Sequence, residues 1–150
     1  MTPKVGDFPD LNNSVWEKTS EPDPSYNCIA FAAGRTDVFW WPDEYPDEES
    51  DYWPHGIRRE ESIAAFIELF KSLGYESCLD GRLETGHEKV AIYALGDLPT
   101  HAARQMPGGR WTSKLGVEDD VVHETPESVA GPCYGQVVQF LRRAIPLKVG

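Results

Sequence analysis

A cysteine and a histidine stand at positions from which they could carry out nucleophilic catalysis together. Cys28 lies in "PSYNCIAFAAGR", residues 24–35, where Ser25 can cap a short apolar helix and Gly34 can end it. The first turn of a helix favours an anion, so this position predicts a lowered pKa for the thiol and a thiolate able to attack a carbonyl carbon. The alternative is a structural role, because free cysteines are among the most buried residues.

His101 is the predicted base for that thiol. It begins "THAARQM", residues 100–106, directly after the turn "GDLP", and a side chain at the start of a strand can reach whatever packs against the sheet edge. An imidazole there would take the thiol proton and later return it to the leaving group. The alternative is a histidine on the surface without a catalytic role.

A third polar group usually orients such an imidazole. The turn "PGG" joins residues 100–106 to "RWTSKLG", residues 110–116, and strand pairing across this turn brings Ser113 beside His101. We therefore predict that Ser113 orients the ring. Later candidates for the same role are Asp119, Asp120 and His123.

Asn27 precedes the predicted nucleophile, and its amide could donate to a developing oxyanion together with the backbone N–H of Cys28. Its alternative role is to cap the helix or a turn. This chemistry needs no cofactor. A metal held by some set of Cys28, His101 and His123 is a further alternative, but no pair among them has the spacing of three or four residues typical of a zinc site.

Residues 37–56, "DVFWWPDEYPDEESDYWPHG", follow the Cys28 helix and have no regular apolar period. We predict an ordered lid in which Trp40, Trp41 and Trp53 form the wall of a substrate cleft. Its acids would attract a cationic substrate; they are Asp43, Glu44, Asp47, Glu48, Glu49 and Asp51. The alternative is a solvated acidic loop that the tryptophans anchor.

The apolar pattern predicts the elements that position these residues. Apolar side chains three and four residues apart predict a helix over residues 58–73, and Gly74 ends it. "YESCLD", "KVAIYAL", "THAARQM" and "RWTSKLG" predict strands of an antiparallel sheet. "YGQVVQFLRRA", residues 134–144, fits a helix or a strand, and we favour the helix. Residues 1–25 are rich in Pro, Asp, Asn and Ser and predict an irregular segment. The order of elements predicts an α+β fold with two helices packed on the sheet.

The composition bounds the partners. A chain of 150 residues with 40% hydrophobic content predicts a single domain, 1–150. The formal charge of −11 repels phosphate backbones and anionic lipids, so we expect neither nucleic acid nor a membrane as partner. No signal peptide and no run of about 18 apolar residues is present, which predicts a cytoplasmic protein, although a dedicated secretion system could still export it. Three cysteines do not make a disulfide framework.

Two segments resemble the papain-like cysteine hydrolase superfamily, in particular small bacterial members that cleave cell-wall peptides or serve as toxins. "YNCIAFAAG" resembles their nucleophile helix, and "THAARQMPGGRWTSKLG…VVHETPESVAGPCYG" resembles the "H…SK-G…H…YG" stretch of papain-like domains in bacteria and phages. The resemblance implies a papain-like fold and a thiol-dependent amidase, peptidase or acyltransferase with Cys28 as nucleophile and His101 as base. It departs at the third position, where the family usually has Asn, Asp or His and this chain offers Ser113 and Lys114.

Two hypotheses of function follow. The first is a cysteine hydrolase that acts on an amide bond of a peptide, in a cell wall or in a protein. The second is a non-catalytic acidic binding protein, an antitoxin or an adaptor, that covers a basic partner with the Trp-rich lid.

Overall fold

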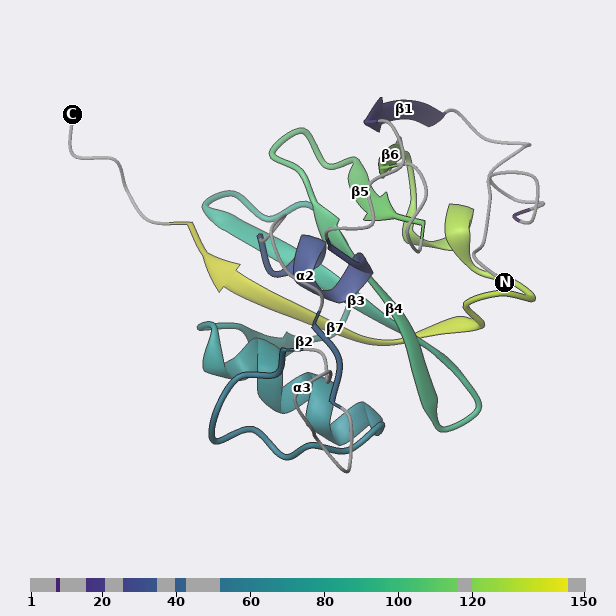
Figure 1. Cartoon of the computed structure of the whole chain (residues 1–150). Helices are drawn as coiled ribbons and strands as arrows, with labels where there is room; N and C mark the ends of the chain where they lie inside the picture. Colours follow the sequence, from purple (N-terminus) through teal and green to yellow (C-terminus); the bar gives the residue numbers. More distant parts are fainter. Residues whose placement is uncertain are drawn as a thin grey trace.

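The computed structural model of the chain describes residue 8 and residues 16–20, 26–34, 40–42, 52–115 and 120–145. Its centre is a seven-stranded antiparallel sheet with the strand order β1-β6-β5-β4-β3-β7-β2 (Figure 1). The strands are β1 (Trp16–Ser20), β2 (Glu76–Cys78), β3 (His87–Leu95), β4 (Leu98–Gln105), β5 (Trp111–Lys114), β6 (Asp120–His123) and β7 (Gln136–Ala144). The helices are α2 (Cys28–Ala32), α3 (Ile63–Ser72) and the 3₁₀ helix η2 (Pro126–Val129).

This architecture is β-rich, so the predicted papain-like α+β fold is wrong. The two α-helices of the described residues have only five and ten residues. The segment 134–144, for which we favoured a helix, contains strand β7, which pairs with β3 along most of its length. The long-range pairing decides this case, because the local apolar pattern fits both periods.

Two further strands were not predicted. β1 lies within residues 1–25, for which we expected an irregular segment, and it pairs with β6 about 100 residues later. β6 in turn continues the sheet beyond β5. Neither strand has enough apolar alternation of its own, so each depends on its partner.

The central strands are confirmed. β3 pairs with β4 so that Tyr93 lies opposite His101, and β4 turns into β5 through the predicted hairpin. The turn is closed by hydrogen bonds from Met106 N to Arg110 O (2.7 Å) and from Gly109 N to Met106 O (2.9 Å). A φ of 95° at Gly109 explains the need for glycine at this point.

The sheet separates two hydrophobic clusters. Successive residues of a strand face opposite sides, so Ile92 packs on one side and Tyr93 on the other. The first side is covered by both helices, through residues such as Ile29 and Phe66. The second side contains Ala103 and Trp111 and is covered in part by η2. We call these the helix face and the η2 face.

The helices begin at defined caps. Ser62 Oγ accepts a hydrogen bond from Ala65 N at 3.1 Å, so α3 begins at Ile63, five residues later than predicted. Asn27 caps α2, whereas the predicted cap, Ser25, lies outside the described residues. Within the described part of the chain, no helix is long and apolar enough to cross a lipid bilayer.

Candidate functional site

Cys28 is the first residue of α2 and lies against the edge of β4. Its Sγ is 3.9 Å from the carbonyl oxygen of Thr100, and the backbone N–H of Ala102 also contacts the sulfur. A carbonyl and an N–H two residues apart point to the same edge of a strand. In the described pairing β5 meets β4 at Arg104 and Gln105, so the sulfur occupies the edge that β5 has left.

Burial decides the protonation of this thiol. Removal from water raises the pKa of Cys28 to about 11, and the contacts that oppose the shift, the N–H groups of Ala102 and Ile29 and the charge of Lys114, are weaker. The predicted lowering of this pKa is therefore wrong, because a helix of five residues in the core offers less than solvent removal costs. Cys28 is a protonated thiol at neutral pH, and any nucleophilic role requires a base.

His101 heads a chain of buried hydrogen bonds on the η2 face. Its Nε2 lies 3.0 Å from Ser113 Oγ, which lies 2.8 Å from His123 Nε2, and His123 Nδ1 lies 2.7 Å from the carbonyl oxygen of Thr125. The three side chains are fully buried. The predicted contact of Ser113 with His101 is confirmed, and His123 stands behind Ser113 rather than in its place. Asp119 lies outside the described residues, and Asp120 faces the other side of the sheet.

These contacts fix the tautomers. A carbonyl oxygen only accepts, so His123 carries its proton on Nδ1 and its Nε2 accepts from the Ser113 hydroxyl. Ser113 then accepts from Nε2–H of His101. Burial lowers the pKa of His123 to about 4 and that of His101 well below its usual value, so both rings are neutral at pH 7. This chain of hydrogen bonds through His101, Ser113 and His123, which we call the relay, thus leaves an unshared electron pair on His101 Nδ1. That nitrogen has no hydrogen-bond partner among the described residues.

Two tyrosines hold the His101 ring, and neither was predicted to do so. Tyr134 stacks on it with 4.0 Å between the ring centroids and 6° between the planes, and Tyr93 meets it edge-on at 5.0 Å. Tyr134 belongs to the "YG" of the motif quoted for the resemblance, and this motif was the sequence feature that could have pointed to its role. The ring is therefore fixed by packing on its faces and by Ser113 at its edge.

The predicted Cys28–His101 pair shares a strand segment but makes no hydrogen bond in this structure. Cys28 belongs to the cluster on the helix face, whereas His101 packs against tyrosines of the η2 face. Both reach the stretch 100–102 of β4, the thiol at its edge and the imidazole from its centre. The thiol donates instead to Thr100 O, so a proton transfer to Nδ1 requires the sulfur to leave that carbonyl and to reach across from the helix face.

Asn27 uses its amide to build the helix start. Oδ1 accepts from the backbone N–H groups of Ala30 and Trp40, each at 3.1 Å, and Nδ2 donates to Trp40 O at 2.8 Å. This is the capping role that we gave as the alternative. The contacts also join the residues after α2 to its first turn, so Asn27 fixes the position of Cys28.

The described part of the predicted lid is anchored in the core. Trp40 and Trp53 are buried, and Trp41 meets Phe66 of α3 edge-on at 5.5 Å while its Nε1 donates to Glu61 at 2.6 Å. These contacts match the anchoring alternative, and the wall of a substrate cleft stays a prediction. The six acids from Asp43 to Asp51 lie outside the described residues.

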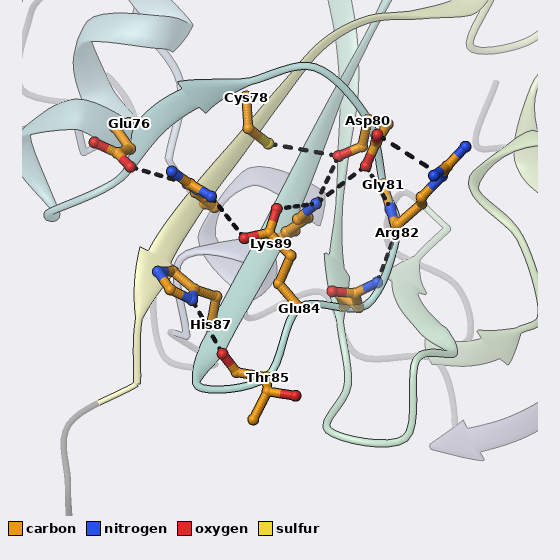
Figure 2. A network of polar contacts seen from close by, with 11 residues as sticks. Glu76, Cys78, Asp80, Gly81, Arg82, Glu84, Thr85, His87 and Lys89 are labelled. Atoms are coloured by element: carbon orange, nitrogen blue, oxygen red, sulfur yellow. Dashed lines mark hydrogen bonds and ion pairs between the residues drawn. The ribbon is translucent and has the colours of Figure 1, made fainter.

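A second polar network lies at the other end of the sheet (Figure 2). The buried ammonium of Lys89 lies 2.9 Å from Glu84 Oε1 and donates to the carbonyl of Asp80 at 2.9 Å, and Arg142 joins Glu84 to Glu76. These pairs tie β2 and the loop after it to β3 and β7. Within the described residues, no three His, Cys, Asp or Glu side chains converge as a metal site would require.

Comparison with known proteins gives a family and no described activity. No curated protein matches the chain, and no solved structure matches it. A family model described as "Domain of unknown function (DUF7689)" matches residues 17–142, so the chain belongs to the DUF7689 family.

Proposed function

We propose that this protein is a cysteine-dependent hydrolase of amide bonds, with Cys28 as nucleophile and His101 as general base. One observation carries the proposal: the relay through Ser113 and His123 leaves a free electron pair on a neutral imidazole at the strand segment that the Cys28 sulfur contacts. A structural histidine in a core gains nothing from an unpartnered nitrogen, which costs about 1–3 kcal/mol. A general base, in contrast, needs such an unshared electron pair on a neutral ring to accept a proton.

The reaction follows from the protonation states. Nδ1 of His101 accepts the thiol proton as the Cys28 sulfur bonds to the carbonyl carbon of the amide. The imidazolium then gives this proton to the amide nitrogen as the C–N bond breaks, and the amine leaves. Water next adds to the thioester carbon, losing a proton to His101, and the acid is released as the sulfur departs and regains that proton.

The relay suits this cycle. When His101 is protonated, its Nε2–H remains a donor to Ser113, so the hydrogen bonds need not rearrange. Because the ring is neutral at pH 7, it begins the cycle in the form that accepts a proton. The backbone N–H groups at the start of α2 are the proposed donors to the oxyanion, because the amide of Asn27 is engaged with Ala30 and Trp40.

Alkylation by iodoacetamide tests the proposal, with the sites identified by peptide mass spectrometry at pH 7.5. We expect Cys28 to react faster than the half-buried Cys78, and His101→Gln to slow Cys28 at least tenfold while Cys78 is unchanged. Circular dichroism checks that the variant folds. Equal rates for Cys28 in the two proteins would refute a base role for His101.

The acidic binding protein is the second candidate. The charge of −11 and the missing hydrogen bond between Cys28 and His101 favour it. An amine-release assay distinguishes the two candidates. The protein is incubated with a mixture of peptides and cell-wall fragments, and the released amines are measured with fluorescamine. Release that Cys28→Ala abolishes supports the hydrolase, and no release by the wild-type protein supports the binder.

A further inference from the structure

A buried cation lies on the helix face directly behind the relay. Lys114 follows Ser113 in β5, so the two side chains point to opposite faces of the sheet. Its side chain is 0% exposed, and its Nζ lies 3.6 Å from Oδ1 of Asp120, the residue opposite it in β6. The proposed mechanism does not use this cation.

The cluster continues to the residue two before the thiol. Nζ of Lys114 lies 4.1 Å from the centre of the Tyr26 ring, and the hydroxyl of Tyr26 donates to Asp120 Oδ2 at 2.5 Å. Tyr26 is itself buried and stacks on Phe31 of α2 with 5.8 Å between the centroids. Lys114, Asp120 and Tyr26, the cation cluster, therefore join β5 and β6 to the start of α2.

Keeping this cluster in the core has a cost. Removing an ammonium from water costs several kcal/mol, which the contacts of Lys114, among them those with Asp120 and Tyr26, must offset. Well-packed apolar residues commonly replace such buried pairs without loss of stability. A charge kept in the core against Tyr26, two residues before the candidate nucleophile, points to an effect on that group.

We propose that Lys114 is a positioning residue of the thiol site: the cation cluster fixes the segment from Tyr26 to Cys28 on β5 and holds a positive charge against the ring of Tyr26, two residues before the thiol. The inference rests on the proposed function. Two consecutive residues of one strand then position both halves of the site, since Ser113 orients the base on the η2 face and Lys114 holds the nucleophile on the helix face. A thiolate formed by proton transfer to His101 would be stabilised by this charge.

The charge of Lys114 acts in the required direction, since it lowers the pKa of Cys28 against the effect of burial. Among the described residues, the carboxylate of Asp120 in β6 and the hydroxyl of Tyr26 face this region, and the neutral His101 of β4 lies across the sheet on the η2 face. Of these, Asp120 opposes the effect of Lys114 on a thiolate.

The pH dependence of Cys28 alkylation tests the inference. Lys114→Met keeps the length of the side chain and removes the charge, and we expect it to move the alkylation profile to higher pH, with labelling at pH 8 slowed about threefold. Lys114→Arg should restore most of the rate. The matched control is Lys89→Met, which removes a second lysine that is fully buried among the described residues, in the network of Figure 2, and should leave the profile unchanged.

An unchanged profile in folded Lys114→Met would overturn the inference. If that variant does not fold, Asp120→Asn decides: it removes the opposing charge and should move the profile to lower pH, and no movement rejects the role of Lys114. The outcomes are separable from those of the proposed function. The His101→Gln variant tests the base role of His101, whereas the Lys114 and Asp120 variants test the effect of the cation cluster on the thiol.

Discussion

Nε2 of His101 lies 3.0 Å from Oγ of Ser113, and the two side chains meet on one face of the sheet from strands that a tight turn joins. A hydroxyl carries no charge, so it cannot stabilise an imidazolium as a carboxylate would. It can, however, accept from one imidazole and donate to another at the same time. The orientation of His101 therefore depends on Ser113, and the direction of the hydrogen bonds depends on His123.

Ser113→Ala should impair the base without touching the thiol. It leaves Nε2 of His101 and Nε2 of His123 without their shared partner, so the tautomer that exposes Nδ1 of His101 is no longer favoured. We expect alkylation of Cys28 to slow at least tenfold and the free energy of unfolding in urea to fall by about 1–3 kcal/mol.

Thr112→Ala is the matched control for that variant. Thr112 is the preceding residue of β5, and its hydroxyl donates to the carbonyl of Val121 outside the relay. Thr112→Ala should lower the free energy of unfolding and leave the rate of Cys28 alkylation at its wild-type value. A wild-type rate in Ser113→Ala would show that the relay does not act on the thiol.

The parts of the fold that follow from short-range pattern could be predicted. The turn after residue 106 sets the register of β4 and β5, and that register brings Ser113 to His101. His123 was among the predicted candidates for orienting His101, but its place behind Ser113 could not be predicted, because His123 reaches Ser113 through the pairing of β5 with β6. Its position in the chain says nothing of this pairing.

Burial is the other quantity that the pattern could not supply. The position of Cys28 at a helix start was predicted, and the direction of its pKa was not, because the direction depends on how many other segments cover the sulfur. The strand β7 shows the same limit, since its apolar residues suit a helix until β3 provides a partner. Local sequence therefore indicates which residues could act, and the packing decides their protonation.

The stability of the protein should fall between pH 6.5 and pH 4. The pKa of His123 is about 4 in the folded chain and 6.5 without burial, and that of His101 is also lowered. The unfolded chain takes up these protons first, so their contribution is fully present above pH 6.5 and is lost as the pH falls towards 4. For His123 the loss is on the order of 3 kcal/mol.

Urea unfolding at pH 7.5 and pH 5 measures this loss. His123→Gln should show a smaller difference between the two pH values than the wild-type protein. The exposed His55 supplies the control, and His55→Gln should keep the wild-type difference. The pKa values of Asp80 and Glu84 are lowered from 3.8 and 4.5, so these carboxylates take up protons in more acidic solution than the range compared here. An equal difference in His123→Gln would mean that this ring is not the source.

A side chain at Gly135 should disrupt the turn that places Tyr134 against the His101 ring. The φ of Gly135 is 77°, and a Cβ built on it would lie 2.0 Å from the carbonyl oxygen of Ala94, a backbone atom that cannot move aside. It also forms a bridge with Gly131, and this turn presents Tyr134 to the imidazole. Gly135→Ala should therefore lose more than about 4 kcal/mol of unfolding free energy, a loss reserved for steric or core disruption.

Gly96→Ala separates the steric effect from the backbone strain. Gly96 also has a positive φ, 60°, but no atom lies within 4 Å of the Cβ that would be added. Strain alone costs roughly 1–2 kcal/mol, so this variant should unfold at slightly lower urea and label at Cys28 at the wild-type rate. If Gly135→Ala is no less stable than Gly96→Ala, then β3 does not approach the turn as closely as the structure shows, and the stacking of Tyr134 on His101 loses its support.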